Sequence, residues 1–181
     1  MSHYFNPAQL PLTNKAFSDA EKVVSRHFRM SEDQLRKNKY DVKTLAYLTQ
    51  HEVKDGAFAH LCKYSFEKPD SPAQKDNEGF DFYRVCLQDN IILDAVDRAN
   101  SFIKLGPLML YIAAHELIHV LRFGNGNIDF DASIEEKELE EKVVHDLTRN
   151  ALQSACNHDL TIVLDCFSSR YKINETPIGQ A

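Results

Sequence analysis

The pattern of apolar and polar positions predicts helices in the first third of the chain. Residues 1–13 show no regular period, so we expect an irregular arm there. Apolar positions from 17 to 28 recur at helical spacing, and Ser18-Asp-Ala-Glu21 fits a capping box near the start of that helix. Ser31-Glu-Asp-Gln34 predicts a second, short helix, and a third is expected to begin at Asp41. These amphipathic helices are expected to flank a sheet.

The middle of the chain changes from a helical period to a period of two. Apolar and polar residues alternate from Phe58 to Phe66 and again from Phe80 to Leu87, which predicts two strands paired as a hairpin. The polar, Pro-containing stretch 68–79 between them is expected to be a long loop, either part of a substrate cleft or a tolerated insertion. Asp89-Asn90 predicts the start of a helix over 91–103.

The most apolar helix of the chain is predicted over 108–123. Gly106-Pro107 suits its first turn, because proline lacks the N–H that would be unsatisfied there. No further Gly or Pro interrupts the segment until Gly124-Asn-Gly-Asn127, which predicts its end. Apolar residues surround its few polar positions, so we expect this helix to be buried nearly all round.

The remainder of the chain is predicted to be mostly helical. Ser133-Ile-Glu-Glu136 is a capping box that begins a helix running to about Ala155. Positions 160–167 fit either a strand or a helix. With residues 174–181 as a tail, these elements predict one α+β domain over 1–181, with a small mixed or antiparallel sheet packed against the 108–123 helix and several others.

Composition narrows the compartment and the partners. Hydrophobic residues make up 43% of the chain and charged residues 27%, as in ordinary globular proteins, and the net charge of −6 argues against broad nucleic-acid binding. The first residues lack the basic start and apolar run of a signal peptide, and no stretch is long enough to span a membrane. The four cysteines form no C-x-x-C motif, so we expect a cytoplasmic protein with reduced thiols.

The buried helix contains the pattern His115-Glu-Leu-Ile-His119, which is an H-E-x-x-H motif. Residues four apart lie on the same helix face, so His115 and His119 present two imidazoles to one point. Two nitrogen ligands, a third protein ligand and a water molecule form the usual catalytic zinc site. Glu116 lies beside the pair, where a carboxylate can accept a proton from a metal-bound water. A metal would also compensate the cost of burying these polar side chains.

The third ligand is expected on the following helix. Leu139, Val143, Leu147 and Ala151 define one apolar face, and Glu140 falls within that face, an odd place for an unpaired carboxylate. Amphipathicity therefore mildly favours Glu140. Glu141 and His145 share a neighbouring face at a spacing of four, which favours Glu141 instead.

The two motifs together resemble the zincin metallopeptidases, in particular the glutamate-zincin branch. In that branch the second helix carries Glu-x-x-x-Asp or Glu-x-x-x-Asn, in which the Glu binds zinc and the fourth residue on hydrogen-bonds a ligand His. Glu141-Lys-Val-Val-His145 has this spacing with His in the last place, so His145 either orients a ligand or is itself the third ligand. The order of preference is Glu141, His145, Glu140. The chain as a whole also resembles small, single-domain, uncharacterised zincin-like proteins of bacteria.

The resemblance implies a zincin-like fold, one zinc ion and a peptide or protein substrate. Glu116 would be the general base, and the strand at 80–87 would be the sheet edge along which the substrate pairs. A group that stabilises the oxyanion is also expected, and the candidates are Tyr111, Arg122, His145, Arg170 and Tyr171.

Other functions fit the same residues. A hydrolase of a non-peptide amide would use the same metal-bound water, and a non-catalytic metal-binding or regulatory domain would retain the fold alone. A protease of DNA-bound proteins or of a transcriptional repressor is a further alternative, although the acidic net charge weakens the DNA-bound version. Two His and one carboxylate also suit iron and other divalent ions.

Overall fold

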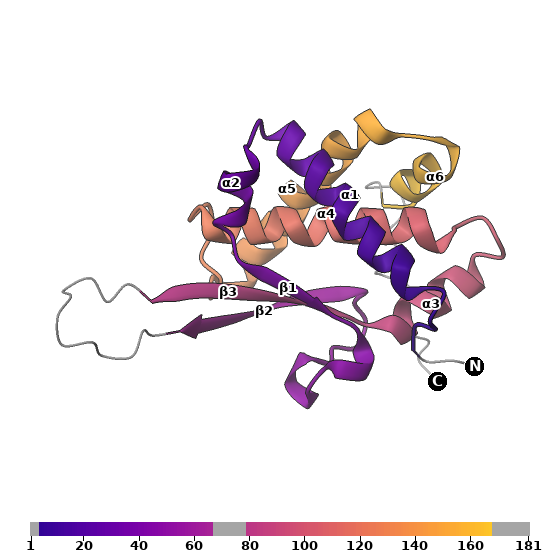
Figure 1. Cartoon of the computed structure of the whole chain (residues 1–181), viewed down its shortest axis with the longest axis horizontal. Coiled ribbons are helices and arrows are strands. Elements are labelled where there is room, and N and C mark those ends of the chain that lie inside the picture. The colour runs from indigo at the N-terminus through magenta and orange to yellow at the C-terminus, as the bar shows by residue number, and fades with distance from the viewer. Residues whose placement is uncertain (1–3, 67–78, 168–181) are drawn as a thin grey trace.

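A three-stranded mixed sheet lies under the long helix α4, and the helices α1, α3, α5 and α6 pack around that helix (Figure 1). The structure is a computed structural model that describes residues 4–66 and 79–167. In chain order the elements are α1 (Leu10–His27), α2 (Glu32–Arg36), β1 (Tyr40–Lys43), the 3-10 turns η1 (Leu45–Tyr47) and η2 (Gln50–Glu52), β2 (Ala59–Phe66), β3 (Phe80–Leu87), α3 (Asp89–Arg98), α4 (Leu105–Gly124), α5 (Ile134–Leu152), η3 (Gln153–Ala155) and α6 (His158–Cys166). The α+β class is confirmed.

The sheet has the order β1-β3-β2, with β1 parallel and β2 antiparallel to β3. The antiparallel β2–β3 pair confirms the predicted hairpin. The prediction that 80–87 is a sheet edge is wrong, because β3 is hydrogen-bonded to a strand on both sides. The strands that leave an edge open are β1 and β2, so any peptide that extends this sheet must pair with one of them.

The two faces of the sheet have different surroundings. Tyr83, Val85 and Leu87 of β3 are buried on the face toward α4, where the Tyr83 ring stacks on Phe123. The side chains between them point to the opposite face, where the segment that contains η1 and η2 lies against one end of the sheet (Figure 1). There Arg84 forms an ion pair with the buried Glu52 of η2.

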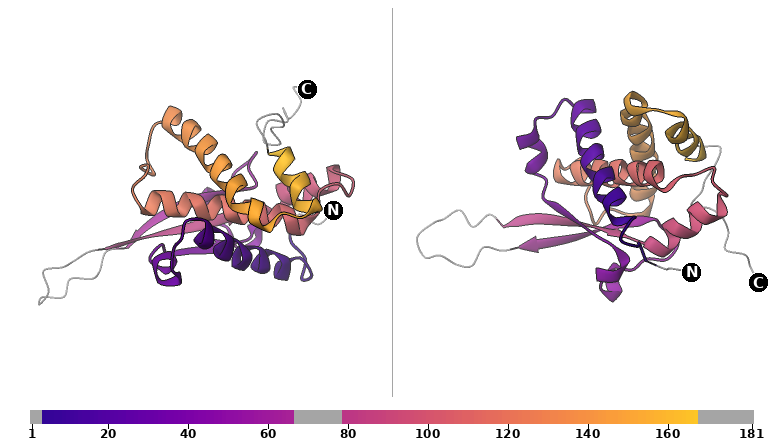
Figure 2. Two further views of the ribbon diagram at one scale, coloured as in Figure 1. Left: turned by 90° about the horizontal axis from the view of Figure 1, so that it is seen from above. Right: turned by 45° about the vertical axis from the view of Figure 1, so that its right-hand side comes forward.

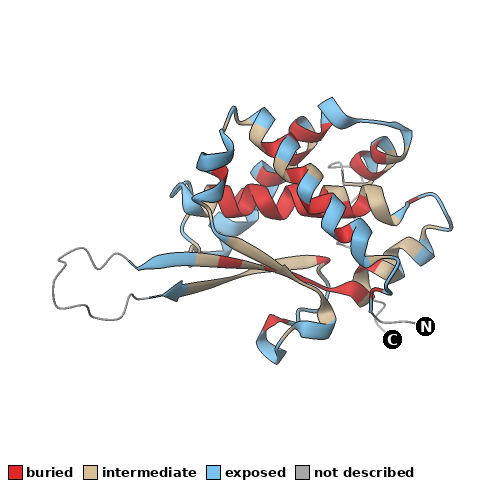
Figure 3. Cartoon of the chain, in the orientation of Figure 1, coloured by how far each residue is buried: buried red, intermediate tan, exposed pale blue. Residues whose placement is uncertain are grey.

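Helix α4 is the centre of the molecule. An unbroken run of buried residues extends from Tyr111 to Leu121, as Figure 3 shows by its colour. In the view of Figure 1, α1 crosses in front of α4 and α5 lies behind it, and the two further views agree (Figure 2). The helix begins at Leu105, earlier than predicted, so Pro107 lies within its first turn, where its missing N–H costs little.

Several predictions for the N-terminal part are wrong. The expected arm 1–13 is helical from Leu10 onward, with a proline in the first turn of α1, and the expected cap at Ser18 lies inside that helix. The helix expected to begin at Asp41 is instead strand β1 followed by two 3-10 turns. A four-residue strand is too short to show a period in the sequence, and only pairing with β3 makes it a strand.

The remaining boundaries follow local signals more closely. Both capping boxes, at Ser31 and Ser133, are present with their reciprocal hydrogen bonds. Helix α3 ends at Arg98, before the predicted 103, and α5 ends at Leu152 with a 3-10 turn after it. The ambiguous segment at 160–167 is helical to Cys166. The predicted loop at 68–79 and the tail at 174–181 lie, except for position 79, outside the described residues.

Within 4–66 and 79–167, no helix combines the length and apolar character needed to cross a membrane.

Candidate metal centre

The two histidines of the H-E-x-x-H motif meet on the side of α4 that faces α5. Their Nε2 atoms are 3.2 Å apart, and both side chains are buried, because α4 packs against its neighbours along most of its length. Helical spacing of four therefore brings His115 and His119 to a common point, as the sequence predicts.

Glu141 of α5 reaches the same point from the neighbouring helix. One carboxylate oxygen lies 3.0 Å from Nε2 of His119 and the other lies 3.3 Å from Nε2 of His115. A tetrahedral zinc ion with bonds of about 2.0–2.1 Å would hold such donors about 3.3–3.4 Å apart. The three side chains thus lie at nearly the separation that a single ion requires, and Glu141 is half-exposed, which leaves this corner accessible to solvent.

His145 lies next to this cluster without being part of its centre. Its Nε2 is 3.9 Å from the Glu141 carboxylate, and its Nδ1 is 2.6 Å from the hydroxyl of Tyr111. His115, Glu141 and His145 also have donor atoms within 4.8 Å of one another. The hydrogen bond to Tyr111 occupies one nitrogen of His145 and fixes the ring beside the cluster, so only its Nε2 faces Glu141.

Glu140, the third candidate ligand, has a different partner. Its carboxylate forms an ion pair with Arg122 of α4, with a distance of 2.9 Å between one oxygen and the second terminal nitrogen. This pair explains why a carboxylate is buried on α5. It also occupies Arg122, which the sequence offered as an oxyanion-stabilising group.

The predicted apolar face of α5 is displaced by about one residue. Leu139 and Val143 are exposed, whereas Val144 and Thr148 are fully buried together with Glu140. The Glu140–Arg122 pair lies on this buried face, and Thr148 satisfies its hydroxyl by donating to the carbonyl of Val144 at 2.7 Å. Because of the rotation, Glu141 stands at the border between α5 and α4, beside the two histidines.

Glu116 is buried next to the cluster and is 7% exposed. Burial raises the pKa of this carboxyl group to about 7, with His119 opposing the shift and Glu141 adding to it. A carboxyl group whose pKa lies near neutrality is suited to accept and return a proton. A bound cation would favour the ionised form and move the pKa down.

The Glu141 carboxylate and the two imidazoles affect one another's pKa values in opposite directions. Burial alone would raise the pKa of Glu141, but contacts with His115 and His119 hold it well below its usual range. Burial lowers the pKa of His115 to about 4, whereas for His119 the nearby carboxylates outweigh burial and raise the pKa. The site therefore holds an ionised carboxylate beside a neutral His115, and both are in the protonation state that metal ligands need.

The two imidazoles make their polar contacts through one ring nitrogen each. The Nδ1 atoms of His115 and His119 are buried and have no hydrogen-bond partner among the described residues. All the polar contacts of these rings are therefore made by Nε2, on the side where Glu141 lies. An ion bound to both Nε2 atoms would leave the two Nδ1 N–H groups unpaired, so among the described residues these rings lack the hydrogen bond that a ligand histidine commonly donates from its second nitrogen.

Aromatic rings close the ends of the cluster. Tyr111 stacks on Phe167 just after α6 with ring centroids 4.1 Å apart, and at the other end His119 stacks on Phe123. The sequence did not single out Phe167, because the segment around it fitted a strand as well as a helix. Its apolar position at helical spacings of seven and four from Leu160 and Val163 is a signal that favours its side chain facing the same side as theirs.

The structure thus places the six sequence-predicted ligand and base candidates as follows. It brings together His115, His119 and Glu141, sets Glu116 and His145 beside them, and separates Glu140 from them. Of the oxyanion candidates, Tyr111 contacts His145. Arg170 and Tyr171 lie outside the described residues.

Comparison of the chain with protein-family models, with curated proteins and with solved structures gave no match.

Proposed function

We propose that the protein is a zinc-dependent hydrolase, and most specifically a peptidase. The observation that carries the proposal is the convergence of His115, His119 and Glu141 on one point, at separations of 3.0 to 3.3 Å, with Glu116 buried beside them. Two imidazoles, one carboxylate and a general base are the metal ligands and the proton acceptor that a mononuclear zinc hydrolase needs. The peptide substrate is supported by the resemblance to glutamate zincins.

Each residue has a role that follows from its position. A zinc ion at this point would polarise the scissile carbonyl and acidify its water. Glu116 accepts the proton of the attacking water and passes it to the leaving amine. His145 offers its Nε2 toward the cluster, and Tyr111 holds the ring in place, so this pair stabilises the oxyanion of the substrate carbonyl.

The first test is the metal content of protein purified without added metal or chelator. We expect close to one zinc per chain at this site, and loss of that zinc in His115→Ala. A matched control is His27→Ala, because His27 lies at the C-terminal end of α1, and its nearest ring is that of Phe28. If zinc content is the same in His115→Ala and in wild type, the proposed site is wrong.

The second test separates a hydrolase from a metal-binding domain without activity. Glu116→Gln keeps the size of the side chain and removes the base, so we expect it to retain zinc and to lose cleavage of a peptide library. Peptide cleavage by the wild type that Glu116→Gln abolishes supports the peptidase. If the protein binds zinc and cleaves only non-peptide amides, the same site acts on a different class of substrate. If the wild type binds zinc and cleaves nothing, a regulatory domain is favoured.

A further inference from the structure

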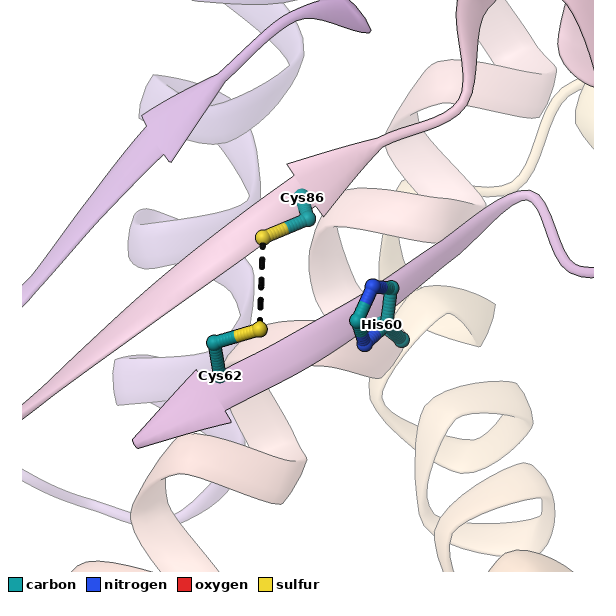
Figure 4. Close-up of side chains that lie close together, drawn as sticks. All are labelled: His60, Cys62 and Cys86. Atoms are coloured by element: carbon teal, nitrogen blue, oxygen red, sulfur yellow. Dashed lines mark hydrogen bonds between the residues drawn. The ribbon is translucent and has the colours of Figure 1, made fainter. Parts of the chain in front are cut away.

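A second group of metal-ligand residues lies on the face of the sheet that points away from α4. His60 and Cys62 are two residues apart on β2, and Cys86 of β3 pairs directly with His60 in the antiparallel register. Residues two apart on a strand, and residues directly opposite across a ladder, share one face of the sheet. The three side chains therefore project to the same side, as Figure 4 shows.

The distances within this group match those of a metal site. The two sulfur atoms are 3.8 Å apart, and all three residues offer donor atoms within 4.8 Å of one another. A tetrahedral ion with metal–sulfur bonds of about 2.3 Å would hold two thiolates about 3.8 Å apart. The sulfur separation is therefore the one that a bound ion would impose.

The strand register argues against a disulfide between the same cysteines. Cys62 pairs directly with Arg84, so Cys86 is its diagonal neighbour. The Cα atoms of such diagonal pairs are about 7–8 Å apart, whereas a disulfide needs Cα atoms within about 7 Å. Both cysteines are free thiols in the structure. An ion can link the two sulfurs across the diagonal without moving the strands.

His60 is held in the tautomer that binds metals. Its Nε2 is 2.7 Å from the backbone carbonyl of Glu52. Since a carbonyl only accepts hydrogen bonds, Nε2 carries the proton and Nδ1 keeps its lone pair. A ligand histidine commonly donates its second N–H to a carbonyl in this way, which fixes the ring and raises its basicity.

The segment that supplies this carbonyl is itself fixed. The same Glu52 carbonyl accepts a bond of 3.1 Å from the side-chain amide of Gln88, and that amide also donates to the carbonyl of Cys86 at 3.2 Å. Glu52 and Gln88 are each 1% exposed. The ligand residues are thus positioned by a buried hydrogen-bond network and not only by the strands.

We propose that His60, Cys62 and Cys86 bind one thiophilic metal ion, zinc or copper(I), at a site separate from the one on α4. Two thiolates and an imidazole are soft ligands that select these ions over magnesium or calcium. Cys62 and Cys86 release their thiol protons to solvent when the ion binds. His60 and Cys62 are partly exposed, so water or a small thiol can take the fourth position.

Cobalt(II) is the probe that tests this proposal, because it substitutes for zinc and reports its ligands in its spectrum. Reduced, metal-free protein is titrated with cobalt(II) in the absence of oxygen. We expect an intense thiolate-to-cobalt charge-transfer band. Its intensity should stop rising once this site holds one cobalt ion per chain. The His115→Ala variant should retain the band, since the site on α4 contains no sulfur. Zinc added afterwards should remove it.

Variants assign the band to these residues. Cys62→Ser should abolish it, and His60→Ala should shift or weaken it. Cys166→Ser in α6 is the matched control and should leave it unchanged, because Cys166 is also a partly buried free thiol. Since the band is first measured on the wild type, loss of folding in a variant cannot conceal a negative result.

Two results would overturn the proposal. The first is a folded, reduced wild-type protein that shows no charge-transfer band with cobalt(II). The second is a band that survives in Cys62→Ser and disappears in Cys166→Ser. Failure of this site leaves the one on α4 untouched, because zinc bound only by His115, His119 and Glu141 gives no sulfur signal.

Discussion

Glu140 and Glu141 are neighbours in the sequence, yet their carboxylates have different partners, so removing each one should have a different consequence. Glu141 contacts the two histidines and is half-exposed. We expect Glu141→Gln to weaken zinc binding by about 100-fold or more, because an anionic ligand is lost. Competition with a chromophoric chelator measures the affinity.

The control for this prediction is Glu138→Gln on the same helix. Glu138 is exposed and is not part of the cluster. The Glu138→Gln variant removes one negative charge from the same helix, so it controls for the general electrostatic attraction between the protein and the cation. Equal zinc affinities in Glu141→Gln and Glu138→Gln would show that Glu141 is not a ligand.

Tyr111 should act on catalysis through His145 and not through the metal. Its hydroxyl lies 2.6 Å from Nδ1 of His145, and its ring stacks on Phe167. We expect Tyr111→Phe to keep the stacking and zinc content while lowering kcat about 10-fold, with KM nearly unchanged. His145→Asn should lower kcat at least as much. A Tyr111→Phe variant with normal kcat and a changed pH profile would contradict the assigned role.

The sequence predicts the parts of the candidate site that depend only on the spacing of residues along one helix. The spacing of four in His115 and His119, and the position of Glu141 relative to His145, each depend on the geometry of one helix. The choice between Glu140 and Glu141 depends on how α5 is rotated against α4, and in the observed rotation Glu140 pairs with Arg122. The group on the sheet depends on the register between two strands that are separated by residues 67–79 in the sequence, and the spacing of the cysteines does not reveal that register.

At the scale of elements, the Glu140–Arg122 pair joins α5 to α4. The Arg122 side chain is 22% exposed and the Glu140 side chain 7% exposed, so little solvent reaches the pair. We expect Glu140→Gln to lower the free energy of unfolding by about 2–4 kcal/mol, because it leaves a partly buried guanidinium without its counter-charge. Urea unfolding of metal-free protein measures this loss.

The zinc affinity of Glu140→Gln shows whether Glu140 only stabilises the fold or also binds the metal. Folded Glu140→Gln should bind zinc with nearly wild-type affinity, and Glu138→Gln should match wild type in both measurements. Should Glu140→Gln instead unfold like wild type and lose zinc, the roles assigned to the two neighbouring carboxylates would have to be exchanged.

The elements that the sequence predicted well are those with complete local signals. The capping boxes at Ser31 and Ser133 and the period of two in β2 and β3 each specify their element without help from distant residues. Strand β1 has no such signal and exists through parallel pairing with β3, which joins segments about forty positions apart in the register Tyr40 to Tyr83. Helix α1 begins early because Pro11 suits its first turn, a signal that the apolar spacing alone does not contain.

On the scale of the whole molecule, the sheet separates two polar networks. The face toward α4 is apolar and supports the helix that carries the two histidines. The opposite face carries Glu52, which accepts hydrogen bonds from Tyr64 at 2.5 Å and from Arg84 at 3.1 Å. Because Arg84 also pairs with Asp41 of β1, this network links all three strands to η2. The ionisation state of Glu52 in this network should therefore affect the free energy of unfolding of the whole domain.

Acid should weaken the fold through Glu52. Burial alone would raise the pKa of this carboxyl group, but the backbone N–H of Thr49, the Tyr64 hydroxyl and Arg84 outweigh burial and lower the pKa from 4.5 to about 2. Because the pKa is lower in the folded state than in the unfolded chain, ionised Glu52 stabilises the fold fully above about pH 4.5. This contribution, about 3 kcal/mol, is lost progressively as the pH falls toward 2.

Glu52→Gln isolates that contribution from the protonation of other carboxylates. At pH 7 the variant should be less stable than wild type by about 3 kcal/mol, and the difference should shrink as the pH falls from 5 to about 2, since wild-type Glu52 becomes increasingly protonated. Glu32→Gln is the control, because Glu32 forms an exposed pair with Arg36 and should show no such convergence. A difference between wild type and Glu52→Gln that stays constant over this pH range would mean that the hydrogen bonds hold the carboxyl and the carboxylate equally well, and that the network stabilises the sheet by packing instead of by charge.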